Sequence, residues 1–85
     1  MIRYLQHARE AMVRRGIDPT WVEAALAAPD WTEPDPGHPG RTCSFRATSE
    51  IGGRVLRVVH WRDGPDVVVL MAHPDRDAAK RRPKV

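Results

Sequence analysis

The sequence predicts an α+β domain in which two N-terminal helices pack on one face of a three- to four-stranded antiparallel sheet. Two observations support this class. Apolar residues recur at three- and four-residue spacing in the first third of the chain, and from residue 43 onward they alternate with polar residues or run continuously. Helical periodicity followed by strand periodicity is typical of α+β domains. With 85 residues, the chain can build one modest core and cannot be a two-domain enzyme.

The first helix is expected from about residue 2 to Arg15. This segment contains no proline or glycine. Its apolar residues form one helical stripe, which consists of Ile2, Leu5, Ala8 and Met12. Gly16 can adopt the left-handed conformation that ends a helix, and Ile17 is placed for the apolar contact that accompanies such an end.

A second helix is expected to start almost at once and to end near Ala28. Asp18 is suited to cap its first turn, and Pro19 fits its first position. Its buried stripe would consist of Trp21, Val22, Ala25 and Leu26. The segment from Arg15 to Pro19 therefore predicts a tight helical hairpin.

Three strands are expected after the helices. Residues 29–40 contain four prolines and two glycines, which predicts an irregular acidic loop. The strands would cover residues 43–48, 54–61 and 67–73 as an antiparallel meander, with turns at Gly52-Gly53 and at residues 63–66. Residues 1–73 would form the domain, and residues 74–85 a flexible basic tail.

The charges are segregated along the chain, although the net charge is only +3. Residues 1–15 carry +3, residues 16–40 carry −5 and residues 41–62 carry +4. Residues 63–73 carry −2, so the predicted domain is neutral and the excess belongs to the tail. The arginine-bearing first helix and first hairpin therefore indicate an anionic partner more specifically than the net charge does.

Several classes of site have no support in the sequence. The single cysteine, Cys43, cannot form an internal disulfide, and its spacing to the four histidines is not that of a metal site. Nucleophile-elbow, phosphate-loop and dinucleotide motifs are missing as well. We therefore expect no metal and no cofactor. No signal peptide or membrane-spanning segment is recognisable, so we expect a cytoplasmic protein that does not contact a membrane.

The remaining candidates are arginines and histidines. Arginine binds phosphate oxygens, and histidine can move protons near neutral pH, which together would suit RNA cleavage without a metal. The candidate catalytic residues are His7, Arg46, Arg57 and His60. The residues expected to contact nucleic acid are Arg3, Arg14, Arg54, His73, Lys80, Arg81 and Arg82.

The pattern leaves the placement of these residues partly open. Arg3, His7, Glu10 and Arg14 would share one face of the first helix, which could equally be a solvated face with a Glu10–Arg14 pair. On the first strand, Arg46 is expected to point away from the core marked by Phe45. Strand alternation then places either Arg57, or Arg54 together with His60, on the helix-free face with Arg46.

Residues 7–17 (HAREAMVRRGI), Gly53-Arg54 and the runs at residues 56–59 and 67–70 resemble a family of small uncharacterised bacterial domains. These domains have a His-Ala start and an Arg-Gly-Ile helix junction, and they are allied to the RelE and BrnT toxin superfamily. The resemblance covers roughly residues 5–73. It implies a RelE-like, microbial-RNase-like fold and a ribonuclease toxin controlled by a separate antitoxin.

We therefore expect a toxin-like, metal-independent endoribonuclease of a toxin–antitoxin pair, with mRNA on the ribosome as one candidate substrate. The basic tail would add nonspecific attraction to RNA. The main alternative is a non-catalytic protein-interaction module or homodimer, in which Trp31 and Trp61 are candidate contact residues. A third interpretation is nucleic-acid binding without cleavage.

Overall fold

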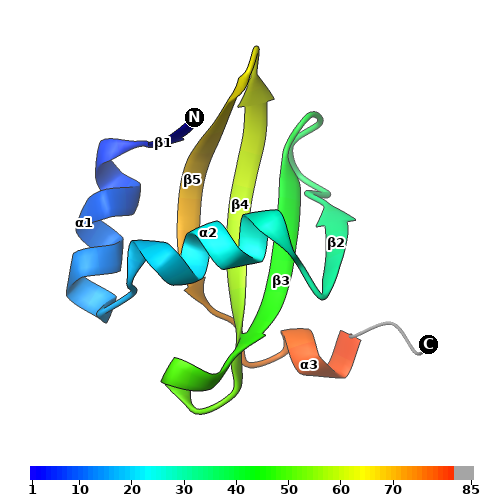
Figure 1. Cartoon of the computed structure of the whole chain (residues 1–85). Coiled ribbons are helices and arrows are strands. Elements are labelled where there is room, and N and C mark those ends of the chain that lie inside the picture. The colour runs from blue at the N-terminus through cyan, green and yellow to red at the C-terminus, as the bar shows by residue number, and fades with distance from the viewer. Residues whose placement is uncertain (82–85) are drawn as a thin grey trace.

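A computed structural model describes residues 1–81, which confirm the α+β class (Figure 1). The elements follow in the order β1 (Ile2–Tyr4), α1 (Gln6–Arg15), α2 (Pro19–Ala27), β2 (Trp31–Pro34), β3 (Thr42–Thr48), the 3-10 turn η1 (Ser49–Ile51), β4 (Arg54–Asp63), β5 (Asp66–Pro74) and α3 (Ala78–Arg81). The strands form one sheet in the order β1-β5-β4-β3-β2.

The sheet is larger than predicted, because it has five strands and is mixed. β2, β3, β4 and β5 pair with one another in antiparallel orientation, whereas β1 runs parallel to β5. The prediction of a purely antiparallel sheet with three or four strands is therefore wrong in detail. β2 lies in the segment expected to be an irregular loop, and Pro34 is tolerated there because β2 is a short edge strand.

The helical hairpin forms as predicted. Gly16 ends α1 with φ of 67°, and the Ile17 N–H donates to the Met12 carbonyl at 2.8 Å. The Asp18 carboxylate then accepts the Thr20 N–H at 2.8 Å and caps α2. The start of α1 was predicted too early, because residues 2–4 are extended along β5 instead of helical.

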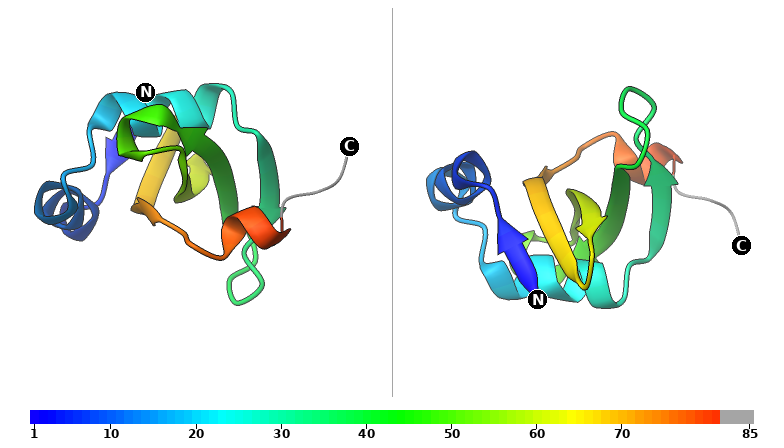
Figure 2. Two further views of the ribbon diagram at one scale, coloured as in Figure 1. Left: turned by 90° about the horizontal axis from the view of Figure 1, so that it is seen from below. Right: turned by 90° about the horizontal axis from the view of Figure 1, so that it is seen from above.

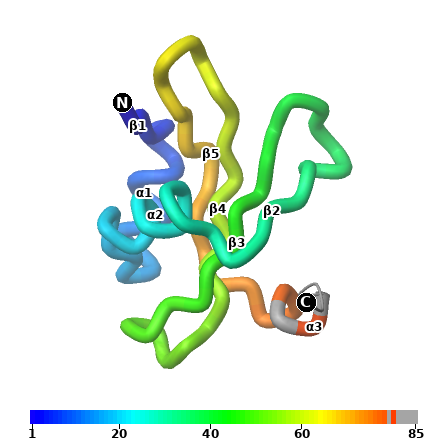
Figure 3. The backbone as a smooth tube through the Cα atoms, turned by 45° about the vertical axis from the view of Figure 1, so that its right-hand side comes forward, coloured from blue at the N-terminus to red at the C-terminus, as the bar shows by residue number. Residues whose placement is uncertain are grey.

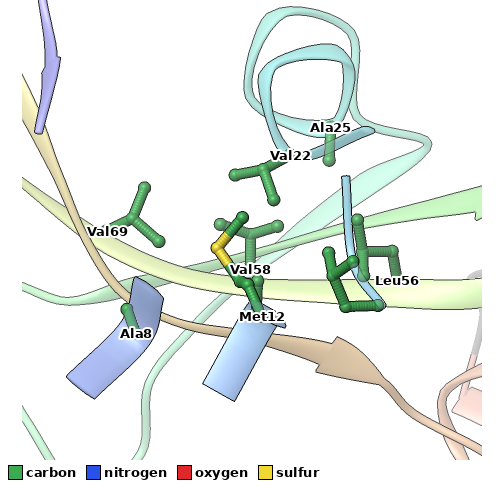
Figure 4. Packing of buried hydrophobic residues seen from close by; sticks show 9 residues of the cluster. Ala8, Met12, Val22, Ala25, Leu56, Val58 and Val69 are labelled. Atoms are coloured by element: carbon green, nitrogen blue, oxygen red, sulfur yellow. The ribbon is translucent and has the colours of Figure 1, made fainter. Parts of the chain in front are cut away.

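The main core lies between the two N-terminal helices and the sheet (Figure 4). α2 crosses one face of the sheet, while α1 packs beside β5 (Figure 1). Both helices contribute small and apolar side chains to a buried cluster that includes Ala8, Met12, Val22, Ala25, Leu56, Val58 and Val69. Removal of these apolar side chains from water stabilises the packing of the helical hairpin on the sheet.

A second buried cluster lies on the other face of the sheet. α3 lies on this face, opposite α2 (Figure 2). The rings of Trp31 and Phe45 stack there, with centroids 4.7 Å apart and an interplanar angle of 8°. Ala78 of α3 is fully buried against this cluster, and the Asp75 carboxylate accepts the N–H groups of Asp77 and Ala78. The domain therefore extends beyond the predicted end at residue 73, because residues 74–81 fold onto the sheet. Residues 82–85 of the predicted tail lie outside the described residues.

Candidate functional site

The structure decides which face of the sheet each candidate arginine occupies. Arg46 pairs with Leu56, and both lie on the face covered by α2, whereas Phe45 pairs with Arg57 on the opposite face. The expectation that Phe45 faces the helices is wrong, since its ring packs on Trp31 in the second cluster. Arg46 and Arg57 therefore point to opposite sides of the sheet.

Three of the four predicted catalytic residues are engaged in structural contacts. Arg46 donates to the Ala28 carbonyl at 2.6 Å and so joins β3 to the end of α2. His60 lies 2.8 Å from the Ser44 hydroxyl, measured between Nε2 and Oγ. Arg57 donates to the Cys43 sulfur at 3.5 Å and forms an ion pair with Asp75 at 3.6 Å. These residues do not converge on one phosphate-sized space.

Arg57 keeps its charge although it is partly buried. Burial alone would favour the neutral guanidine, but the Cys43 sulfur and the Asp75 carboxylate outweigh that effect and raise the pKa of Arg57. Its Nε atom is buried and has no hydrogen-bond partner among residues 1–81. The same Asp75 also holds the first turn of α3, so Arg57 stabilises the packing of α3 on the sheet.

Burial lowers the pKa of His60 below the usual value of 6.5, and nearby Arg62 adds to the effect. The unfolded chain therefore binds a proton at His60 that the folded chain excludes, so this contribution to stability is complete above about pH 6.5 and is lost as the pH falls. We expect acidification from pH 7 to pH 5 to destabilise the wild type more than His60→Gln, as measured by urea denaturation at each pH. Parallel pH profiles of the two proteins would contradict this assignment.

The residues expected to contact nucleic acid are scattered. Arg3 lies in β1 and is paired with Asp63 and Asp66, so it does not share the α1 face with His7. Arg54 donates to the Ile51 carbonyl at 3.0 Å in the β3–β4 turn. Lys80 is exposed on α3, while the Arg81 side chain and Arg82 lie outside the described residues.

A groove between α1 and β5 brings the other candidates together. It has a volume of about 230 Å³. Its lining consists of His7, Glu10, Ala11, Arg14 and Arg15 from α1, and Met71, Ala72 and His73 from β5. Arg15 and Met71 were not predicted: Met71 lies in a continuous apolar run, and Arg15 lies beside the helix end, so neither carried a sequence signal. Three predicted residues, His7, Arg14 and His73, meet in this groove.

The groove exists because β1 is short. β1 pairs with β5 only at residues 67–69, and the chain then turns at Leu5 into α1. On the edge of β5 that faces away from β4, the remainder of the strand therefore lies beside α1 instead of another strand (Figure 1). The helix turns His7 and Arg14 toward the groove, since residues at intervals of three and four share one helical face.

The groove is lined by side chains that can transfer protons and bind anions. His73 Nδ1 lies 3.0 Å from the Pro74 carbonyl oxygen, which can only accept, so Nδ1 carries the proton and Nε2 of the neutral ring is an acceptor. The Glu10 carboxylate accepts from the Gln6 amide at 3.1 Å, and Arg14 forms no ion pair with any residue of the range 1–81. Arg14 is therefore available to an anionic ligand.

Comparison with known families places the chain. A family model described as "Domain of unknown function (DUF4258)" matches residues 4–77. The chain belongs to the DUF4258 family. The match runs from β1 to the residues that precede α3, and it includes both histidines of the groove. No curated protein and no solved structure matches the chain.

Two further findings describe this DUF4258 domain. In residues 1–81, no helix has the length and apolar character needed to cross a membrane. Within the same range, no group of three or more His, Cys, Asp or Glu residues is placed to hold a metal ion. The ionisable side chains that line the groove are those of His7, Glu10, Arg14, Arg15 and His73.

Proposed function

We propose that the groove between α1 and β5 is the active site of a metal-independent endoribonuclease, of the toxin-like kind that the RelE and BrnT resemblance implies. The observation that carries the proposal is the meeting of two histidines, from opposite ends of the chain, with an arginine that has no acidic partner among the described residues. Cleavage of RNA through its own 2′-hydroxyl needs a base, an acid and a cation for the phosphate.

The groove supplies all three groups. His73 acts as the base, because its Nε2 is the free acceptor, and removes the proton from the 2′-hydroxyl. The 2′-oxygen then forms a bond to phosphorus, and the bond from phosphorus to the 5′-oxygen breaks. His7 as the acid gives its proton to that leaving oxygen, while Arg14 stabilises the charge that develops on the phosphate. The products are a 2′,3′-cyclic phosphate and a 5′-hydroxyl.

The partners follow from the same proposal. The substrate is RNA, because DNA lacks the attacking hydroxyl. In a toxin–antitoxin pair, a separate antitoxin would block the groove until it is degraded, and the substrate would be mRNA in the cytoplasm. In this proposal Arg46, Arg57 and His60, which the sequence predicted to be catalytic, have structural roles. Arg14 and His73 take over the catalytic roles.

The test is cleavage of an end-labelled RNA of mixed sequence in the presence of EDTA. We expect fragments that end in 2′,3′-cyclic phosphate, and no cleavage of DNA of the same sequence. Growth arrest should follow when the protein is induced in a bacterial host. Intact RNA in the presence of folded protein would overturn the proposal; if RNA then still bound in a salt-sensitive manner, the alternative of a nucleic-acid-binding module would be favoured.

A further inference from the structure

A second hollow surrounds Trp61 at one end of the sheet. Two adjoining cavities of about 330 Å³ and 340 Å³ share Gly40, Trp61 and Arg62 as lining residues. This end of the sheet carries the loop before β3 and the turn between β4 and β5 (Figure 3). Neither histidine of the α1–β5 groove lines either cavity, so the hollow is a separate site.

The topology of the sheet opens this hollow. β3 begins at Thr42, which pairs with His60, so residues 61–63 of β4 pair with β5 and have no partner strand on the β3 side. Pro39 and Gly40, from the loop before β3, line the hollow together with Trp61. The Trp61 ring is therefore only partly buried.

Two arginines flank the ring, and neither is neutralised. The Arg41 guanidinium carbon lies 5.5 Å from the centroid of the Trp61 ring. Within residues 1–81, neither Arg41 nor Arg62 forms an ion pair. The acids nearest to Arg62 along the chain, Asp63 and Asp66, are both engaged by Arg3. Asp35, whose backbone N–H donates to the Arg41 carbonyl, accepts the Gly37 N–H through its carboxylate.

We propose that this hollow binds a segment of single-stranded nucleic acid, with a base stacked on the Trp61–Arg41 pair and flanking phosphates on Arg41 and Arg62. Aromatic rings and guanidinium planes both stack on unpaired bases, and unneutralised arginines track the backbone. Base pairs in a duplex hide the faces of their bases, so the hollow selects single strands.

The hollow lies at the end of the sheet, where Trp61 follows Arg57 on one strand face and where Leu26 and His60 line the hollow from the face covered by α2. Arg57 pairs with His73, and Trp61 lies four residues further along β4, which corresponds to about 13 Å along the strand. A single strand bound at Trp61 could therefore extend toward His73. The stacking site is nonetheless independent of cleavage, since its residues do not line the α1–β5 groove.

The test uses a fluorescein-labelled DNA hexanucleotide of thymidines, which has no 2′-hydroxyl and cannot be cleaved by the proposed chemistry. Binding is measured by fluorescence anisotropy at low salt. Trp61→Ala should raise Kd roughly 5- to 150-fold, while Trp61→Phe, which keeps a stacking face, should retain most of the affinity. Arg62→Ala should lower the salt slope by about 0.7, the value for one phosphate contact with a single strand.

Arg76→Ala is the matched control, because it removes one exposed arginine outside the hollow. In the Arg76→Ala background, Trp61→Ala should still raise the Kd for the hexanucleotide by the same factor. Equal affinity of the wild type and Trp61→Ala, or of the wild type and Arg41→Ala/Arg62→Ala, would overturn the proposal. Equally tight binding of hexaglutamate would overturn it as well, because a stacking site requires bases.

The test also separates this site from the proposed ribonuclease. A wild type that binds the hexanucleotide through Trp61 but leaves RNA intact would support the stacking site and refute the ribonuclease. A wild type that cleaves RNA but does not bind the hexanucleotide through Trp61 would support the ribonuclease and refute the stacking site.

Discussion

Replacing His7 with alanine should lower the rate of RNA cleavage by about 10²- to 10⁴-fold, the range that a general acid or base contributes. The imidazole is exposed on the surface of α1 and lines the groove, so its loss removes a proton donor without opening the core. The melting temperature should therefore stay close to that of the wild type. The measurement is a single-turnover cleavage rate with excess protein.

His73→Ala should have an effect of similar size, and the double variant should be little worse than either single variant, because acid and base act in one step. His38→Ala is the matched control, since His38 is exposed in the loop before β3 and lies outside the groove. Unchanged cleavage by folded His7→Ala protein would remove His7 from the mechanism. Loss of cleavage in the His38 variant would show that the groove is not the site.

Phe45→Ala should destabilise the domain by about 3–5 kcal/mol, the usual cost of truncating a buried phenylalanine. The ring is completely buried on the face of the sheet that α3 covers, and it stacks on Trp31. Its removal leaves a cavity and deprives Trp31 of its stacking partner. In a domain of this size, such a loss is a large part of the total stability.

The free energy of unfolding by urea measures this effect. Phe45→Leu keeps most of the volume and should cost much less. Thr32→Ala, on the exposed side of β2, should change stability by no more than about 0.5 kcal/mol. A Phe45→Ala protein as stable as the Thr32 variant would contradict the second cluster as a structural core.

Local signals were sufficient to predict the helical hairpin. Gly16 and Asp18 act through hydrogen bonds to residues within one turn, which form as expected, and Pro19 occupies the start of α2. The strands β1 and β2 were missed because long-range pairing creates them. Ile2 fits a helical stripe by its spacing, but its actual partner is Val67, far along the chain. The extended conformation of residues 2–4 depends on their pairing with β5, which local spacing does not predict.

The candidate site was predicted in part, for a related reason. Helical spacing correctly placed His7, Glu10 and Arg14 on one face. Strand alternation, in contrast, separates two faces without saying which one the helices cover, and here both faces are buried by different elements. The sequence therefore left open which residues of the second strand share a face with Arg46, and the structure shows that Arg57 lies on the opposite face.

A titration followed by NMR would test the central claim most directly, namely that RNA is bound for cleavage in the groove between α1 and β5. The ligand is a 2′-O-methyl RNA, which lacks the attacking hydroxyl and stays intact. We predict that the imidazole resonances of His7 and His73 shift together, with one common Kd, while those of His38 stay in place. Saturation of the protein with this RNA while the His7 and His73 resonances remain unmoved would contradict the account.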